Sequence, residues 1–275
     1  MFRTVLTAFA VAAASLISVG AALAQGAIPE QREFCADRPG KGAATCVLDQ
    51  GVVQVESGLV DFASHRDAAF KIESWAVAST LIRYGLTPLL EVQVGLTPWQ
   101  TESVTDRQTG DQDSVEGVGD LFLSARRALG NPDGSGRSAA IQGYLTLPTG
   151  SDAVRADGIE GGLVLPFGLP IDHNWSLALT PGIDIVRDAD GEGSHVAWGM
   201  VAGLGRDVGD WNLGAEVWVS RDEDPLDEVT QSTFDLTAVW SPPFMANAQI
   251  DFGLNFGLND QSPDLEFGVG VARRF

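Results

Sequence analysis

Hydrophobic and polar residues alternate along most of the chain after residue 50. In the stretch 246–258, for example, one parity carries Ile250 and Phe252, and the other carries Asp251 and Asn255. A period of two sends successive side chains to opposite faces of a β-strand. The pattern predicts twelve strands, over residues 51–61, 73–84, 89–99, 118–129, 138–147, 160–168, 174–186, 195–206, 211–220, 231–241, 247–257 and 264–275.

The two faces of these strands indicate what surrounds them. A soluble β-sandwich turns its apolar face inward and fills its core with large side chains. Here the face opposite the apolar one is rich in Gly, Asn, Asp, Glu and Thr, as a wet interior requires. Loops after even strands are short, whereas those after odd strands, such as 100–119, are mostly longer and more acidic. The sequence therefore predicts an all-β fold: a closed antiparallel transmembrane β-barrel of about 12 strands in the bacterial outer membrane, with both ends in the periplasm.

Aromatic residues and the last strand favour the same fold. Amphipathic rings gather at the two membrane interfaces of such barrels. We expect the short-turn ends to carry Tyr84, Trp175, Trp211, Trp240 and Phe275, and a long-loop end to carry Trp99. The last strand must pair with the first, because hydrocarbon tolerates no open edge. A terminal Phe on an alternating strand resembles the assembly signal of outer-membrane proteins, which implies the barrel assembly machinery as a partner. Arg273 departs from that signal, and its head would extend to interfacial water.

The start of the chain predicts export. Residues 1–24 combine Arg3, an apolar run and a final "ALA", which is typical of a secretory signal peptide. The alternative, a transmembrane anchor, is disfavoured by polar residues within the run. Residues 25–50 are irregular and form a short periplasmic segment, and residues 51–275 form the barrel. In an oxidising compartment, Cys35 and Cys46 are expected to form a disulfide.

The charge balance excludes one class of partner. The chain has 17 Lys and Arg against 37 Asp and Glu, a formal charge of −20. Removal of the signal peptide takes away Arg3 and makes this −21. Nucleic acid is not an expected partner, because phosphate contacts require basic residues. The expected partners are outer-membrane lipid, lipopolysaccharide and a small-molecule solute.

Candidate catalytic and metal chemistry is weak. The histidines are His65, His173 and His195, and none forms a dyad with a nucleophile in the predicted strands. Carboxylates occur in 187–195 and 106–113, but neither stretch has the full calcium-loop spacing. These loops are interpreted as solvated acidic surface, or as carboxylates that meet divalent cations bridging lipopolysaccharide. The sequence predicts no catalytic residues, no metal site and no cofactor.

Charged residues on the inward parity are the most informative set. Charge is costly in lipid, so these side chains must face the lumen. They are the eight acidic residues Glu56, Glu91, Asp120, Asp184, Glu216, Asp235, Asp251 and Glu266 and the three basic residues Arg83, Arg126 and Arg274, and the polar Gln54 shares their parity. They line an open, cation-favouring pore, or else Arg83 and Arg126 pair with carboxylates and block it. Residues 25–50 offer a further way to close the lumen, as a plug.

Four stretches, in order, resemble the family described as "Putative MetA-pathway of phenol degradation". They are "VVQVESGLV" (52–60), "TLIRYGLTPLLEVQVG" (80–95), "GVGDLFLSARRAL" (117–129) and "YLTLPTGS" (144–151). The resemblance implies a transporter-like outer-membrane barrel for small, often aromatic molecules. Phe122, Tyr144 and Trp218 share the inward parity and would supply a stacking path for such a solute.

The sequence therefore predicts a channel for passive passage of small solutes, aromatic or hydrophobic ones included. A closed structural or interaction barrel is the alternative, and an outer-membrane lipid hydrolase is the third hypothesis. A channel needs a continuous water path, whereas an enzyme needs a nucleophile and a base at one lip of the barrel.

Overall fold

The computed structural model describes residues 32–275, so the predicted signal peptide lies outside the described residues. These residues form the strands β1 (Val53–Arg66), β2 (Phe70–Thr87), β3 (Leu90–Leu96), β4 (Trp99–Asp106), β5 (Gln112–Gly117), β6 (Leu121–Ala128), β7 (Ser138–Leu147), β8 (Glu160–Val164), β9 (Phe167–Pro170), β10 (Trp175–Arg187), β11 (Ser194–Val208), β12 (Trp211–Asp222), β13 (Val229–Trp240), β14 (Ala248–Gly257) and β15 (Leu265–Arg274). The described residues contain no helix that is long and apolar enough to cross a membrane.

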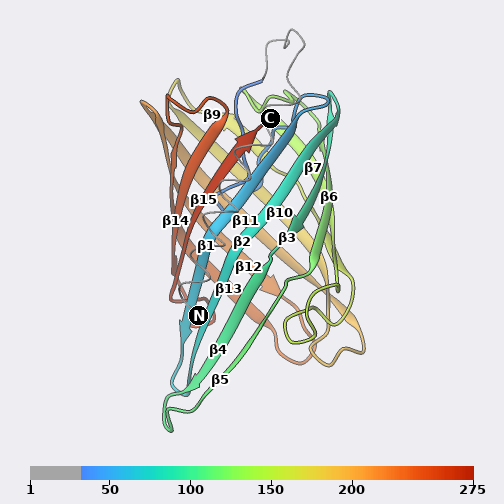
Figure 1. Cartoon of the computed structure of the whole chain (residues 1–275), viewed down its shortest axis with the longest axis vertical. Coiled ribbons are helices and arrows are strands. Elements are labelled where there is room, and N and C mark those ends of the chain that lie inside the picture. The colour runs from blue at the N-terminus through green and yellow to red at the C-terminus, as the bar shows by residue number, and fades with distance from the viewer. Residues whose placement is uncertain (1–31) are drawn as a thin grey trace.

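The strands form one closed antiparallel barrel of twelve spans (Figure 1), which confirms the predicted fold. Three spans consist of two strands each. β3 and β4 both pair with β2, β5 and β6 pair with β4 and β3, and β8 and β9 both lie between β7 and β10. Pro98 and Pro166 occupy two of the breaks, because proline has no N–H to donate to the ladder.

The seam between the first and last strands closes the barrel, as the sequence predicts. β1 pairs with β2 on one side and with β15 on the other. The register shifts between Gly58 and Val60, where one extra residue forms a bulge. At the end of the seam, the backbone N–H of Phe275 donates to the carbonyl of Val53 at 2.8 Å. No backbone edge of β1 or β15 is left for lipid.

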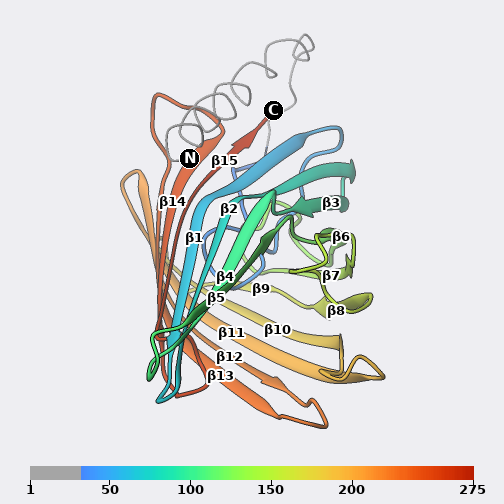
Figure 2. The same ribbon diagram turned by 60° about the horizontal axis from the view of Figure 1, so that its bottom comes forward.

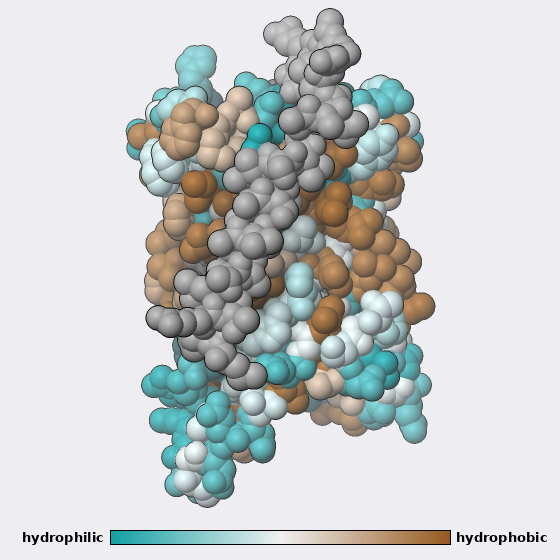
Figure 3. Space-filling model, viewed as in Figure 1, coloured by the Kyte–Doolittle hydropathy of each residue, from teal (hydrophilic) through white to brown (hydrophobic). Residues whose placement is uncertain are grey.

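Large apolar side chains cover the outside of the barrel. Among the exposed ones are Ile82, Leu213, Val217, Phe234, Leu236, Phe252 and Leu254, all on the outward parity. Outside the grey atoms, Figure 3 shows hydrophobic residues over the middle of the molecule and hydrophilic residues towards its ends. In a soluble protein this surface would favour aggregation, whereas in a bilayer it is the lipid-facing band.

The expected aromatic residues lie at the end of the barrel that carries both termini of the described strands. Trp211 and Trp240 face each other across β12 and β13, with ring centroids 5.9 Å apart. Arg273, the residue that departs from the assembly signal, places its guanidinium 5.4 Å from the Phe275 ring. The prediction that Trp99 lies at a long-loop end was wrong. Trp99 is the first residue of β4 and lies opposite Val77, in the middle of β2, because β4 continues beyond it.

The acidic stretch expected as a long loop after residue 99 is instead a β-hairpin. β4 and β5 pair along their whole length and reach the lowest point of the molecule in Figure 1. Their turn spans only residues 107–111. The Asp106 carboxylate accepts the backbone N–H groups of Gln108 and Thr109, and Gly110 adopts a φ of 79°, which a side chain would strain.

Residues 32–50 contain no strand and lie inside the barrel, near the end where the C-terminus lies (Figure 2). We call this segment the plug. The predicted disulfide between Cys35 and Cys46 is present and closes a loop within it. Residues 32–50 of the segment expected in the periplasm therefore lie in the lumen, as the plug alternative predicts.

Candidate functional site in the barrel lumen

The centre of the lumen is a network around Arg83, a fully buried residue of β2. Its guanidinium donates to Glu91 at 3.0 Å through two nitrogens and to Glu56 at 2.8 Å. A fourth bond, of 3.1 Å, goes to the carbonyl of Cys35 in the plug. Two carboxylates and a fork of donors satisfy each other here, as buried charges require.

Arg126 of β6 extends this network two strands further along the wall. Its Nη2 lies 2.7 and 2.8 Å from the two carboxylate oxygens of Asp37, and its Nη1 lies 3.3 Å from Glu91. Its Nε donates to Gln142 at 2.9 Å. Both arginines therefore pair with carboxylates, as the closed-lumen alternative states.

The plug backbone is held by the same wall carboxylates. Glu56 accepts the backbone N–H of Asp37 at 2.9 Å, and Glu91 accepts that of Leu48 at 2.9 Å. Asp37 itself accepts the N–H of Ala44 at 2.8 Å, which folds the segment on itself. An irregular segment cannot pair its own backbone groups, so the wall supplies the partners.

A row of inward residues crosses four neighbouring strands. Glu216 of β12 lies opposite Asp235 of β13, which lies opposite Asn255 of β14, which lies opposite Glu266 of β15. We call these four residues the acidic row. Lys41 of the plug meets it: its Nζ lies 2.6 Å from Glu266, and its backbone N–H donates to Glu216 at 3.0 Å.

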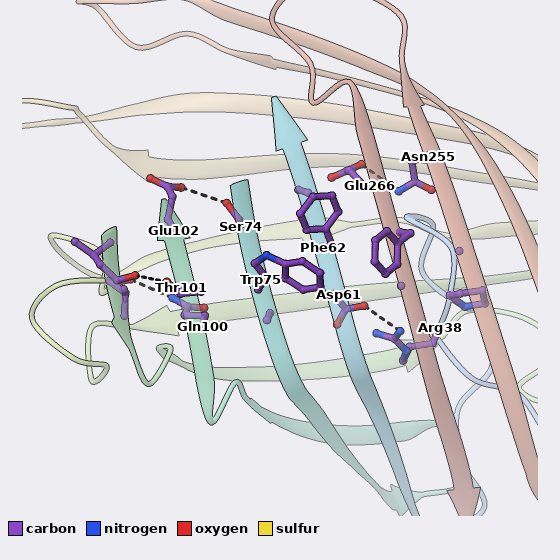
Figure 4. Close-up of a pocket in the computed structure, with 18 of the residues that line it drawn as sticks. Arg38, Asp61, Phe62, Ser74, Trp75, Gln100, Thr101, Glu102, Asn255 and Glu266 are labelled. Carbon is purple, nitrogen blue, oxygen red and sulfur yellow. Dashed lines mark hydrogen bonds and ion pairs between the residues drawn. The ribbon is translucent and has the colours of Figure 1, made fainter. Parts of the chain in front are cut away.

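Cavities lie on both sides of plug residues 38–40. The outer one, about 640 Å³, is lined by Asp61, Glu102, Glu266 and the loop residues 153–155 as well as Arg38 (Figure 4). A second cavity of about 400 Å³ is lined by Phe34, Glu216, Thr237, Ser241 and Gln249, towards the end with short turns. Arg38 and Pro39 line both, so this stretch of the plug is the partition between them.

Arg38 fastens the partition to the wall. Its Nε lies 3.2 Å from Asp251, and its Nη2 lies 3.2 Å from Asp61. Figure 4 shows the second of these pairs at the edge of the outer cavity. The partition and the adjacent Lys41 are less buried than the network behind them: Arg38 and Lys41 are each 21% exposed, whereas Arg83 has no exposed surface.

The remaining predicted residues lie along another part of the wall. Tyr144 donates its hydroxyl to Asp184, and its ring centroid lies 5.5 Å from that of Phe122. Asp120 accepts the backbone N–H groups of Gly150 and Ala156, both at 2.8 Å, and so holds the loop after β7. These four aromatic and acidic residues are not part of the acidic row.

The family model described as "Putative MetA-pathway of phenol degradation" matches residues 36–275. The chain belongs to this family. The match covers most of the plug as well as the whole barrel, which confirms the resemblance seen in four short stretches. A comparison with curated proteins found no match.

Solved structures with the same fold are outer-membrane barrels. The COG4313 outer membrane channel from Pseudomonas putida F1 is 17% identical, with a TM-score of 0.65, over 91% of this chain and 100% of that one. The β domain of the Bordetella autotransporter BrkA is 10% identical, with a TM-score of 0.54, over 82% and 100%. The transport unit of the autotransporter AIDA-I from Escherichia coli is 9% identical, with a TM-score of 0.52, over 95% and 97%. This family member is therefore an outer-membrane β-barrel.

The structure brings the predicted lumen residues of this family member into three groups. Glu56, Arg83, Glu91 and Arg126 form the central network; Glu216, Trp218, Asp235, Asp251 and Glu266 face the partition; and Asp120, Phe122, Tyr144 and Asp184 line the wall opposite. The sequence reasoning did not identify Asp37, Arg38 and Lys41 as their partners. An irregular segment has no hydrophobic periodicity, so the charged residues within it were the only sign in the sequence that it has partners.

A second cluster of titratable side chains lies at the start of β11, at the end of the barrel away from the short turns. His195 Nδ1 lies 2.8 Å from Asp188, and its Nε2 lies 2.5 Å from Asp222. Burial alone would lower the pKa of His195, but the Asp188 hydrogen bond and the charges of Asp222 and Asp224 raise it above its ordinary value. The ring thus joins the β10–β11 and β12–β13 loops. Asp188, His195 and Asp224 also offer three possible metal-ligand atoms within 4.8 Å of one another.

Proposed function

We propose that this barrel passes small solutes across the outer membrane, by local displacement of plug residues 38–41. The observation that carries the proposal is the position of Arg38 and Pro39 between two cavities that face opposite ends of the barrel. A solute that enters the outer cavity needs only this stretch to move in order to reach the inner one.

Differences in burial within the plug support a local movement. The backbone N–H groups of Asp37 and Leu48 donate hydrogen bonds to carboxylates of the buried network. The disulfide between Cys35 and Cys46 joins the two ends of the stretch that contains the partition. Arg38 and Lys41, by contrast, are only partly buried, and they hold the wall through ion pairs with Asp61 and Asp251 and with Glu266. Segments with few buried contacts open at lower free energy than the core to which they are attached.

We also infer that the barrel acts without catalysis. Both nitrogens of His195 lie against carboxylates, and Ser194 beside it accepts a bond from Arg187 instead of facing the ring. Acyl transfer needs a nucleophile that is bonded to its base.

The closed structural barrel is the second candidate function. Arg83 and Arg126 are fully buried between wall and plug, and this favours a lumen in which the plug stays in place. The two candidates differ in whether the partition moves while the barrel remains folded.

A disulfide lock distinguishes them. A Cβ atom added at Gly253 would lie 3.6 Å from the Cβ of Pro39, within the range of natural disulfides. We expect the variant Pro39→Cys/Gly253→Cys to lose conductance in planar bilayers and solute flux in liposomes when oxidised, and to regain both on reduction. The unmodified protein with the same reductant is the control. Equal flux through locked and unlocked protein would refute passage past the partition, and no flux in either would leave the closed barrel.

A further inference from the structure

The acidic row contains more negative charge than the described residues neutralise. Glu216 and Asp235 lie directly opposite each other, an arrangement that is unfavourable for like charges. Glu266 has Lys41 as its partner, and Asn255 donates to the same carboxylate at 3.1 Å. The row therefore holds three carboxylates around one ammonium group.

Asp235 is the residue that points to a missing ligand. It is 1% exposed, yet neither of its carboxylate oxygens makes a hydrogen bond among the described residues. The hydroxyl of Thr233, the next inward residue of β13, is the donor beside this carboxylate, but it makes no hydrogen bond of standard geometry. Burial of a carboxylate without a partner is costly, so a site of this kind is completed by a donor or a cation.

An aromatic ring stands beside the same position. Trp218 is the next inward residue after Glu216, and Lys41 Nζ lies 4.3 Å from its ring centroid. Carboxylates together with the face of a Trp ring form the kind of site that binds ammonium groups. The plug backbone approaches this wall closely at Gly40, because a Cβ atom there would lie 2.7 Å from the Glu216 carboxylate.

We propose that the acidic row and Trp218 form a binding site for the ammonium group of an organic amine solute, and that Lys41 occupies this site as a tethered competitor. The inference rests on the proposed function for its transport step, because Glu266 lines the outer cavity and Glu216 the inner one. An incoming ammonium group replaces Lys41 at Glu266 and gains Asp235, and so removes one of the two side-chain attachments of this stretch of the plug, while Arg38 keeps the other.

Equilibrium binding tests this inference independently of flux. The probe is benzylammonium, and neutral benzyl alcohol and anionic benzoate are matched controls of similar size. In calorimetry on the purified barrel in nanodiscs, we expect Lys41→Met to bind benzylammonium about 10-fold more tightly than the unmodified protein, because a tethered group competes at about millimolar effective concentration. Benzyl alcohol and benzoate should show no such gain.

Further variants locate the site. Asp235→Asn and Glu266→Gln, each combined with Lys41→Met, should abolish the gain. Lys71→Met is the matched control, since Lys71 pairs with Glu73 on the outward face of β2. In the unmodified protein, saturating benzylammonium should speed hydrogen exchange at the Lys41 amide, and this reading does not depend on the folding of any variant.

The outcomes separate this inference from the proposed function. Equal affinity of Lys41→Met and unmodified protein for benzylammonium, or an equal gain for benzyl alcohol, would overturn the ammonium site. Ammonium binding without flux would keep the site and refute transport. Flux of neutral solutes without ammonium binding would do the reverse.

Discussion

Arg83 shows how one side chain joins the plug to the wall. It has no exposed surface and bonds two carboxylates of neighbouring strands as well as a plug carbonyl. Loss of one partner of a buried ion pair leaves the others uncompensated, at a cost of about 3–5 kcal/mol. We therefore expect Arg83→Met to lower the free energy of unfolding by roughly that amount in urea titrations of the barrel in lipid vesicles.

Arg155 provides the comparison for Arg83. Its ion pair with Asp152 is exposed, at 47% and 88% of the two side chains. Exposed pairs contribute little, because water and salt screen them. Arg155→Met should leave the unfolding midpoint unchanged within error. Equal effects of the two substitutions would contradict the buried network.

His195 should make the outer loops sensitive to pH. Its folded-state pKa lies above the ordinary value, because Asp188, Asp222 and Asp224 outweigh the effect of burial. A raised pKa gives stability that is complete below the unfolded-state pKa of about 6.5 and is lost as pH rises through the folded-state value. Protection factors for hydrogen exchange in 188–193 and 223–228 should therefore fall as pH rises above neutrality.

The variant His195→Gln checks the origin of this effect. It removes the titrating group, so the protection factors of both loops should be low and should no longer change with pH. The turn 107–111, which contains no histidine, should behave alike in both proteins. A pH dependence that survives in His195→Gln would assign it to another group.

At the scale of elements, strand β15 accommodates the plug through its small inward residues. A Cβ atom at Gly270 would lie 2.3 Å from Arg38 Nε, whereas one at Gly253 on β14 would be in ordinary contact with Pro39 at 3.6 Å. Gly270→Ala should therefore displace Arg38 from Asp251 and speed hydrogen exchange over residues 38–44, while the barrel stays folded. Gly253→Ala is the matched control and should leave the exchange of the plug unchanged.

The elements also show which signals the sequence contains. Twelve spans could be predicted because lipid on one side and water on the other enforce a period of two. The β4–β5 hairpin could not be predicted, because "QTESVT" (100–105) has Val104 as its one apolar residue and therefore shows no apolar face. The plug could not be placed either, since its bonds, such as Arg38 to Asp251, join residues 213 positions apart and follow no local pattern.

At the scale of the whole molecule, parity predicts that a residue faces the lumen but not which residues meet there. Asp235 and Glu216 face each other because of the register of β12 and β13, and these strands are joined by the loop 223–228, which has no short-turn motif that would predict this register. The sequence analysis therefore identified the wall of the site and left its pairs open. Charged side chains of the plug decide whether a wall carboxylate is already paired or is free to attract an ion.

The outer cavity should make passage through the barrel favour cations. Asp61, Glu102 and Glu266 face Arg38 and Arg155 across it, an excess of acidic residues in a narrow, water-filled space. Such a space concentrates counter-ions of opposite sign, over a screening length of about 10 Å at 0.1 M salt and about 3 Å at 1 M. The ratio of cation to anion permeability, from reversal potentials in planar bilayers, should therefore fall towards the ratio of the free ions as salt rises.

Substitution of the cavity acids separates this field from other sources of selectivity. Glu102→Gln combined with Glu266→Gln removes two of the three carboxylates, so cation preference at 0.1 M salt should drop while conductance at 1 M changes little, because the field is then screened within about 3 Å. Glu73→Gln is the control, since this residue has outward parity and pairs with Lys71 outside the lumen. A cation preference that persists unchanged at high salt, or that Glu73→Gln lowers equally, would show that the cavity carboxylates do not set it.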